Sequence, residues 1–219
     1  MQQRDWMMDF AAAIDLTLKL RRQMPRYPGD HAPRLRHLQS LERGDALTIS
    51  ELTTNCHVGT HADAPAHFLP HGATIDRLAR KHFFGEACVV DLTRVEQITE
   101  VDLRSVDIPS NCHIILKTRN TGLLKRRSFT SGYCHLSVDA AARLLERAPL
   151  SIGIDYYSLD PVSETEFPAH RLVAEAGLPV FVCFDLRKVS AGSYKLAAFG
   201  VPFEGAEAMQ VRAFLSRCR

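Results

Sequence analysis

The chain has 219 residues, of which 46% are hydrophobic and 24% charged, and its formal net charge is +2 at pH 7. This length suits one large domain, so we expect residues 1–219 to fold as a single unit with residues 1–10 as a flexible N-terminal extension. The near-neutral charge argues against nucleic acid or a membrane surface as a partner, and no apolar run approaches the roughly 20 residues that span a bilayer.

Short apolar or alternating runs predict strands, and two amphipathic runs predict helices. The strands are expected at residues 47–53, 87–92, 113–117, 150–154, 180–184 and 194–199. Ser137 is the expected N-cap of a helix over 138–147, and a second helix over 168–176 ends at Gly177. Residues 208–215 fit either a strand or a short helix. The pattern predicts an α/β or α+β fold with a mixed sheet.

Three imidazoles and one carboxylate lie within residues 57–67, and these are His57, His61, Asp63 and His67. Gly59 and Pro65 argue against a long regular helix there, so we expect a strand that ends in a tight loop. On an extended backbone, His61 and Asp63 can point the same way. Imidazole and carboxylate together, without cysteine, suit a water-activating zinc, manganese or iron(II) site rather than a closed structural zinc site.

The alternative for this segment is a polar loop. Asp63-Ala64-Pro65 by itself would be an ordinary turn, and a lone histidine is more often a surface or core residue than a ligand. The grouping of four such side chains favours metal binding.

The same segment resembles the His-x-Gly-Thr-His-x-Asp-x-Pro-x-His signature of the cyclase-like metal hydrolases, which include bacterial kynurenine formamidases and isatin hydrolases. Further similarities to the family occur on both sides of this segment, at residues 14–17, 27–30, 85–91, 115–118, 153–155, 158–161, 168–170 and 184–186. The resemblance implies the family's swivelling β/β/α architecture. It also implies a homo-oligomer, either a homodimer or a homotetramer.

Carried over by position, the resemblance makes His57, His61 and Asp63 ligands of one divalent ion, Zn or Mn. His170 either completes this ligand set or positions the substrate. In two-metal members of the family, the aspartate bridges to a second ion that a later glutamate helps to hold. Here Val182 stands at the position of that glutamate, and a valine cannot bind a metal. We therefore expect one ion.

The resemblance also implies roles for three neighbouring side chains. It assigns proton transfer to His67, as the general base. Kynurenine formamidases usually place a tryptophan where this chain has Tyr27, and Tyr27 can still stack on a flat substrate or, alternatively, shield the edge of the core. Phe68, next to His67, is the second expected substrate contact.

These residues predict a hydrolase that cleaves a carbonyl C–N bond in a small molecule, either a formamide or a cyclic amide. A divalent ion lowers the pKa of bound water to about 7 and polarises a carbonyl group. A lactone hydrolase and a metal-dependent lyase or cyclase are alternative enzymes that the same residues could serve. A catalytically silent metal-binding relative is the alternative from a different class.

The N-terminal residues and the cysteines indicate the cellular compartment of the protein. Residues 1–10 are charged and lack the apolar core of a secretory signal. The six cysteines are scattered without a Cys-x-x-Cys pair, which is typical of buried thiols in a reducing compartment. We expect a cytoplasmic protein.

Overall fold

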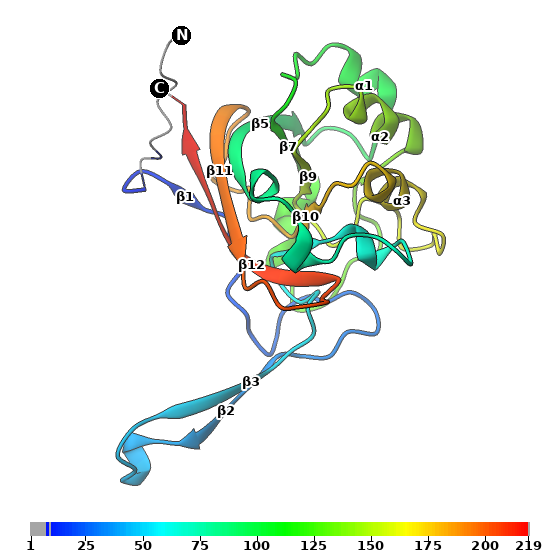
Figure 1. The fold of residues 1–219 in the computed structure, drawn as a ribbon. Helices are drawn as coiled ribbons and strands as arrows, with labels where there is room; N and C mark the ends of the chain where they lie inside the picture. The colour runs from blue at the N-terminus through cyan, green and yellow to red at the C-terminus, as the bar shows by residue number, and fades with distance from the viewer. Residues whose placement is uncertain (1–7, 9, 219) are drawn as a thin grey trace.

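The computed structural model describes residue 8 and residues 10–218, so most of the expected flexible extension over residues 1–10 lies outside the described residues. Its main sheet contains β1 (Ile14–Asp15), β4 (His61–Asp63), β5 (Phe84–Leu92), β7 (His113–Thr118), β9 (Ser151–Ile154), β10 (Val180–Val182), β11 (Gly192–Gly200) and β12 (Ala208–Arg217). The strand order is β1-β12-β11-β5-β7-β9-β10-β4. The sheet closes into a barrel-like core because β12 pairs with β4 through its first residues and with β11 through the rest (Figure 1).

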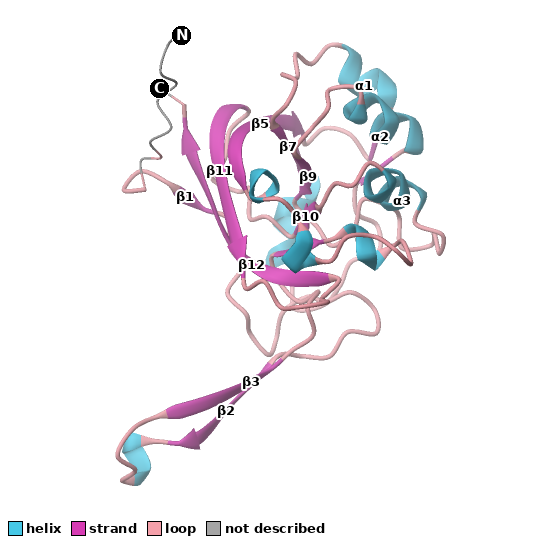
Figure 2. Cartoon of the chain, viewed as in Figure 1, coloured by secondary structure: helices cyan, strands magenta, loops and turns pink. Residues whose placement is uncertain are grey.

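The helices α1 (Glu100–Arg104), α2 (Val138–Leu145) and α3 (Pro168–Glu175) lie together on one side of this barrel (Figure 2). They cover β5, β7, β9 and β10, which run parallel to one another. Because side chains alternate along a strand, Ile114 of β7 packs beneath the helices, whereas Ile115 packs inside the barrel with Phe181. Two apolar cores therefore share the same strands, one on each face.

Two smaller sheets and several short helices complete the described chain. The smaller sheets pair β2 (Arg34–Gln39) with β3 (Ile49–Thr53), and β6 (Gln97–Ile98) with β8 (His135–Leu136). Short 3₁₀ helices occupy Leu41–Arg43, Pro65–His67, Ile75–Arg77, Arg80–His82 and Arg119–Lys125. No helix among the described residues is both long and apolar enough to cross a membrane.

The predicted α/β fold with a mixed sheet is confirmed. Each of the six predicted strands has a counterpart, and the helices predicted over 138–147 and 168–176 are α2 and α3. Ser137 caps α2 as expected, because its Oγ accepts a hydrogen bond from the backbone N–H of Ala140 at 3.2 Å. Residues 208–215, which fit both a strand and a helix, belong to β12. The sequence patterns indicated neither β2 nor α1.

The β2–β3 hairpin extends away from the barrel as an arm (Figure 1). Every residue of its two strands is exposed. The arm and its connecting turn nevertheless carry large apolar side chains, which are Leu35, Leu38, Leu41, Leu47, Ile49 and Leu52. A two-stranded hairpin is at best marginally stable in water by itself, so this arm lacks the covering layer that stabilises other hairpins.

Asp155 is a fully buried carboxyl group just after β9. It accepts hydrogen bonds from both the backbone N–H of Thr118, at 2.9 Å, and the hydroxyl of the same residue, at 2.7 Å. Burial raises the pKa of Asp155 to about 7, although the hydrogen bonds from Thr118 oppose that shift. This contact joins the end of β7 to the segment that follows β9.

We predict that Asp155 makes the free energy of unfolding depend on pH. The folded protein keeps the Asp155 proton up to about pH 7, whereas the unfolded chain loses it near pH 3.8, so stability falls as pH rises between these values. The slope from this group is at most about 1.4 kcal/mol per pH unit. Relative to Asp155→Asn, the wild-type chain should lose stability from pH 4 to pH 7 in denaturant titrations.

The matched control is Asp107→Asn, because Asp107 is an exposed carboxylate in the loop between α1 and β7. This control should follow the wild-type pH profile. Parallel profiles for wild type and Asp155→Asn would contradict the assignment.

Candidate metal centre

The segment before β4 turns sharply and then becomes extended, which sets the direction of two predicted ligands. Gly59 has a φ of +80°, a left-handed conformation that favours glycine. Along β4, Ala62 packs inside the barrel. His61 and Asp63 therefore share the opposite face of the strand, as the sequence predicted.

Three donor atoms converge at this face of β4. Nδ1 of His57 lies 3.0 Å from Oδ1 of Asp63, and Nε2 of His61 lies 3.2 Å from the same oxygen. Ligand atoms of these three residues all lie within 4.8 Å of one another. Oδ1 of Asp63 is buried and has no hydrogen-bond partner among the described residues. A buried carboxylate oxygen with two imidazole nitrogens beside it is a donor set that fits a divalent cation.

The hydrogen bonds around the imidazoles fix which nitrogen faces this point. Nδ1 of His61 lies 2.8 Å from the carbonyl oxygen of Gly59 and donates its proton there, so Nε2 presents its lone pair toward Asp63. The backbone N–H of His57 donates to Oδ1 of Asn55 at 3.1 Å, which holds the loop that carries the His57 ring.

Charges at the site favour a cation. Burial by itself raises the pKa of Asp63, but the imidazoles of His61 and His57 hold it well below its usual value, so Asp63 is ionised. Burial by itself lowers the pKa of His57, yet Asp63 and Glu207 together raise it to about 9. The two carboxylates thus attract positive charge to the space around His57.

Glu207 is a site residue that the sequence did not reveal. Its Oε1 lies 3.1 Å from Nε2 of His57, at the ring edge opposite to Asp63. Glu207 stands 150 positions away from His57 in the chain, just before β12, and no motif marks it. Only the pairing of β12 with β4 brings it to the site.

His67 and Phe68 end the short helix Pro65–His67 and lie beside the three donors. The His67 ring centroid is 4.2 Å from that of His57 and 4.4 Å from that of Phe68. Burial lowers the pKa of His67 and the neighbouring imidazole of His57 lowers it further, whereas Asp63 opposes the shift. His67 is therefore neutral at pH 7, which is the state that a general base needs.

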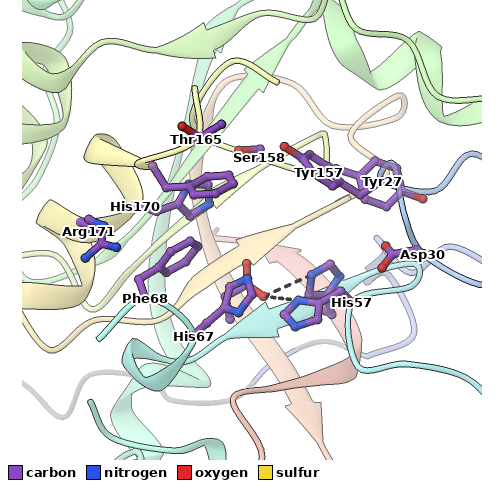
Figure 3. A pocket seen from close by; sticks show the side chains of 13 residues that line it. Tyr27, Asp30, His57, His67, Phe68, Tyr157, Ser158, Thr165, His170 and Arg171 are labelled. Atoms are coloured by element: carbon purple, nitrogen blue, oxygen red, sulfur yellow. Dashed lines mark ion pairs between the residues drawn. The ribbon is translucent and has the colours of Figure 1, made fainter. Parts of the chain in front are cut away.

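His170 lies in α3 across the cavity from His57, outside the group of three donors (Figure 3). Its Nδ1 donates to Oδ2 of Asp160 at 2.7 Å, and Asp160 also accepts the backbone N–H groups of Ala169 and His170 at the start of α3. The imidazole stacks on Phe68, with ring centroids 4.6 Å apart. Asp160 thus fixes the ring, and Nε2 at its other edge accepts the backbone N–H of Leu159 at 3.4 Å.

Val182, at the position expected for a second-metal glutamate, is the cross-strand partner of His61. Its side chain is fully buried in the apolar core beneath α3, together with Ala169 and Val173. The described residues contain one group of three donors suited to a metal ion, and Val182 contributes no polar atom beside it.

The three donors, His67, Phe68 and His170 line one cavity with a volume of about 410 Å³. Figure 3 shows Tyr27, Tyr157 and Asp30 on one side, Phe68, His170 and Arg171 on the other, and His57 and His67 between them. This volume is in the range of small-molecule sites. The structure therefore brings every predicted site residue into one cavity.

Beside the predicted Tyr27, the cavity wall contains Asp30, a carboxylate to which the sequence assigned no role. The Tyr27 ring packs edge-on against Phe129, with centroids 5.4 Å apart. Oδ1 of Asp30 accepts from Nδ2 of Asn55 at 2.6 Å, whereas Oδ2 of Asp30 is buried and has no partner among the described residues. The Tyr27-Pro28-Gly29-Asp30 turn thus places an aromatic ring and a carboxylate oxygen at the cavity wall.

Known sequences related to this chain include one protein family and several named enzymes. The model of the putative cyclase family matches residues 14–161. A kynurenine formamidase from Bacillus cereus is 29% identical over 202 residues, which cover 92% of this chain and 96% of that protein. A kynurenine formamidase from Geobacillus thermodenitrificans is 28% identical over 204 residues, which cover 93% and 97% of the two chains.

Solved structures share the same fold over almost the whole chain. A potential metal-dependent hydrolase with cyclase activity superposes with a TM-score of 0.82 at 25% identity, over 94% of this chain and 98% of that chain. Isatin hydrolase A from Labrenzia aggregata superposes with a TM-score of 0.81 at 20% identity, over 94% of each chain. The predicted cyclase-like architecture is confirmed by these similarities.

Proposed function

The chain belongs to the putative cyclase family, and from this membership we propose that it is a metal-dependent hydrolase of a carbonyl C–N bond. The observation that carries the proposal is the convergence of His57, His61 and Asp63 around a buried carboxylate oxygen that has no hydrogen-bond partner in the described part of the chain. Kynurenine formamidases that match over nine tenths of this chain support an arylformamide as the substrate class.

His57, His61 and Asp63 would hold one divalent ion, Zn or Mn. When bound, such an ion lowers the pKa of water and polarises a carbonyl oxygen. A single ion is supported by Val182, since the second carboxylate ligand expected of a two-metal site is absent and an apolar side chain fills its place. His170, whose Nδ1 is held by Asp160, either joins the ligands or positions the substrate.

His67 would transfer the proton in both halves of the reaction. As a neutral imidazole it accepts a proton from the attacking water while the new C–O bond forms at the carbonyl carbon. It then donates this proton to the nitrogen as the C–N bond breaks, so that a free amine and a carboxylate leave.

Aromatic side chains would bind the flat part of the substrate. Tyr27 and Phe68 line the same cavity from different sides, and Phe167 and Tyr157 add further aromatic surface. Offset or edge-on contacts with an aryl ring add about 0.5–1.5 kcal/mol beyond burial. This lining supports an aryl amide rather than a small aliphatic one.

The function is tested by turnover together with metal content. Purified protein should contain about one zinc or manganese ion per chain and hydrolyse N-formylkynurenine or isatin. A chelator should abolish turnover, and the same metal should restore it. One labelled oxygen atom from solvent should appear in the carboxylate product, whereas a lyase would incorporate none. Metal retained without turnover of any carbonyl substrate would indicate the silent relative.

We predict that His67→Ala lowers kcat by about 10² to 10⁴-fold, because general acid–base catalysis contributes a factor of this size. The metal content of this variant should equal that of the wild type, since His67 lies outside the three-donor group. Elemental analysis with steady-state kinetics checks both. Loss of the metal would show His67 to be a ligand instead. His71→Ala, four residues farther along the chain, is the matched control.

A homodimer or homotetramer is the proposed assembly, and the β2–β3 arm supports it. Leu35 and Leu52 are direct cross-strand partners on this arm and are 65% and 56% exposed. Exposed apolar patches of this kind mark interaction surfaces. A second copy of the chain would supply the layer that the arm lacks.

The prediction is that Leu35→Glu with Leu52→Glu lowers the oligomeric state. Light scattering coupled to size exclusion should give at least twice the chain mass for the wild type and the monomer mass for the variant. Val101→Glu is the control, because Val101 is 66% exposed on α1, outside the arm, and should leave the mass unchanged. A monomeric wild type would contradict the assembly.

The cytoplasm is the proposed location. All six cysteines are free thiols, and four of them, Cys88, Cys112, Cys134 and Cys183, are buried. Such unpaired, buried thiols are typical of a reducing compartment.

A further inference from the structure

We infer that Glu207 is a positioning residue for the metal centre. Its carboxylate holds the His57 ring from the side opposite to Asp63 and thereby raises the metal affinity of the site. The inference rests on the proposed function, because it assumes that His57 is a ligand. It concerns a carboxylate that lies outside the group of three donors.

The geometry places one carboxylate at each nitrogen of the same ring. Nδ1 of His57 lies 3.0 Å from Oδ1 of Asp63, and Nε2 lies 3.1 Å from Oε1 of Glu207. The two ring nitrogens of an imidazole point away from each other, so a cation bound beside Asp63 cannot also contact Glu207 along the same edge. Glu207 is therefore suited to receive the Nε2 proton and not to coordinate the ion.

A carboxylate at this position has two physical effects on the His57 imidazole. It fixes the tautomer, because Nε2–H donates to Glu207 and the lone pair is left on Nδ1. It also makes Nδ1 a stronger donor, since negative charge at the far edge of the ring favours positive charge at the near edge. Removal of such a partner typically lowers metal affinity 10- to 100-fold.

The backbone around Glu207 holds it in register with the ligands. The carbonyl oxygen of Glu207 accepts the N–H of Ala64 at 2.8 Å, and Ala208 pairs with Asp63. Farther along β12, Nε2 of Gln210 donates to the carbonyl oxygen of Asn55, whose side chain holds the backbone of His57. β12 thus fixes the loop of His57 as well as its ring.

The side chain of Glu207 is 44% exposed, so its ion pair with His57 is not expected to contribute much to the stability of the fold. An exposed ion pair contributes little to stability. Replacement of Glu207 should therefore leave the unfolding temperature of the chelator-treated protein unchanged, which separates a positioning role from a structural one.

The experiment measures the zinc dissociation constant of the full chain by competition with a chromophoric chelator. Glu207→Ala should raise this constant 10- to 100-fold. Glu207→Gln keeps an acceptor for Nε2–H without the charge, so its constant should lie between those of the wild type and Glu207→Ala. At saturating zinc, both variants should recover most of the wild-type kcat.

Glu204→Ala is the matched control, because it removes the same charge from an exposed position in the same connection between β11 and β12. Its zinc dissociation constant should equal that of the wild type. An equal loss in Glu204→Ala, or equal constants for Glu207→Gln and Glu207→Ala, would reveal long-range charge alone and overturn the inference. A dissociation constant for Glu207→Ala within twofold of wild type would also overturn it. Absence of zinc binding by the wild type would overturn the proposed function as well.

Discussion

The double pairing of β12 is the constraint on which the rest of this structure depends. Its first residues pair with β4 and the rest with β11, so a single strand closes the barrel. β4 is only three residues long and lies between β10 and β12. Two of those three residues are His61 and Asp63, which are held at fixed spacing because both edges of their strand are paired.

A buried carboxylate at such a position needs compensation. Asp63 is 4% exposed, and its Oδ1 faces two imidazoles rather than water. Isolated buried charges are costly, and proteins retain them when they are paired or coordinate metals. The polar residues of the site thus surround this charge in layers. His57 and His61 contact Asp63 directly, and Glu207 and Asn55 form hydrogen bonds to His57. On the facing wall, Asp160 orients His170.

Most of the predicted site residues are encoded in one short segment, whereas Tyr27 and His170 were assigned only by their positions in the family resemblance. The spacing of His61 and Asp63 indicated a shared face, and Val182 indicated a missing carboxylate, since both depend on local alternation or position. Glu207 could not be found in this way, because its distance to His57 is set by the closure of the barrel. The contact of Asp155 with Thr118 and the strand β2 could not be predicted either. A buried hydrogen bond depends on tertiary packing, and every residue of β2 is exposed, so this strand has no buried face for a sequence pattern to mark.

The position of β12 in the chain also affects when the site can form. On a growing chain, residues 57–67 are made well before Ala208, so the motif leaves the ribosome without the strand that completes its pairing. Contacts between residues so distant in sequence form late, because a long loop must close first. Until then, the carboxylate of Asp63 stays in water and the barrel stays open. A chain that stalls before Glu207 and β12 therefore lacks the carboxylate beside His57 and leaves one edge of β4 unpaired.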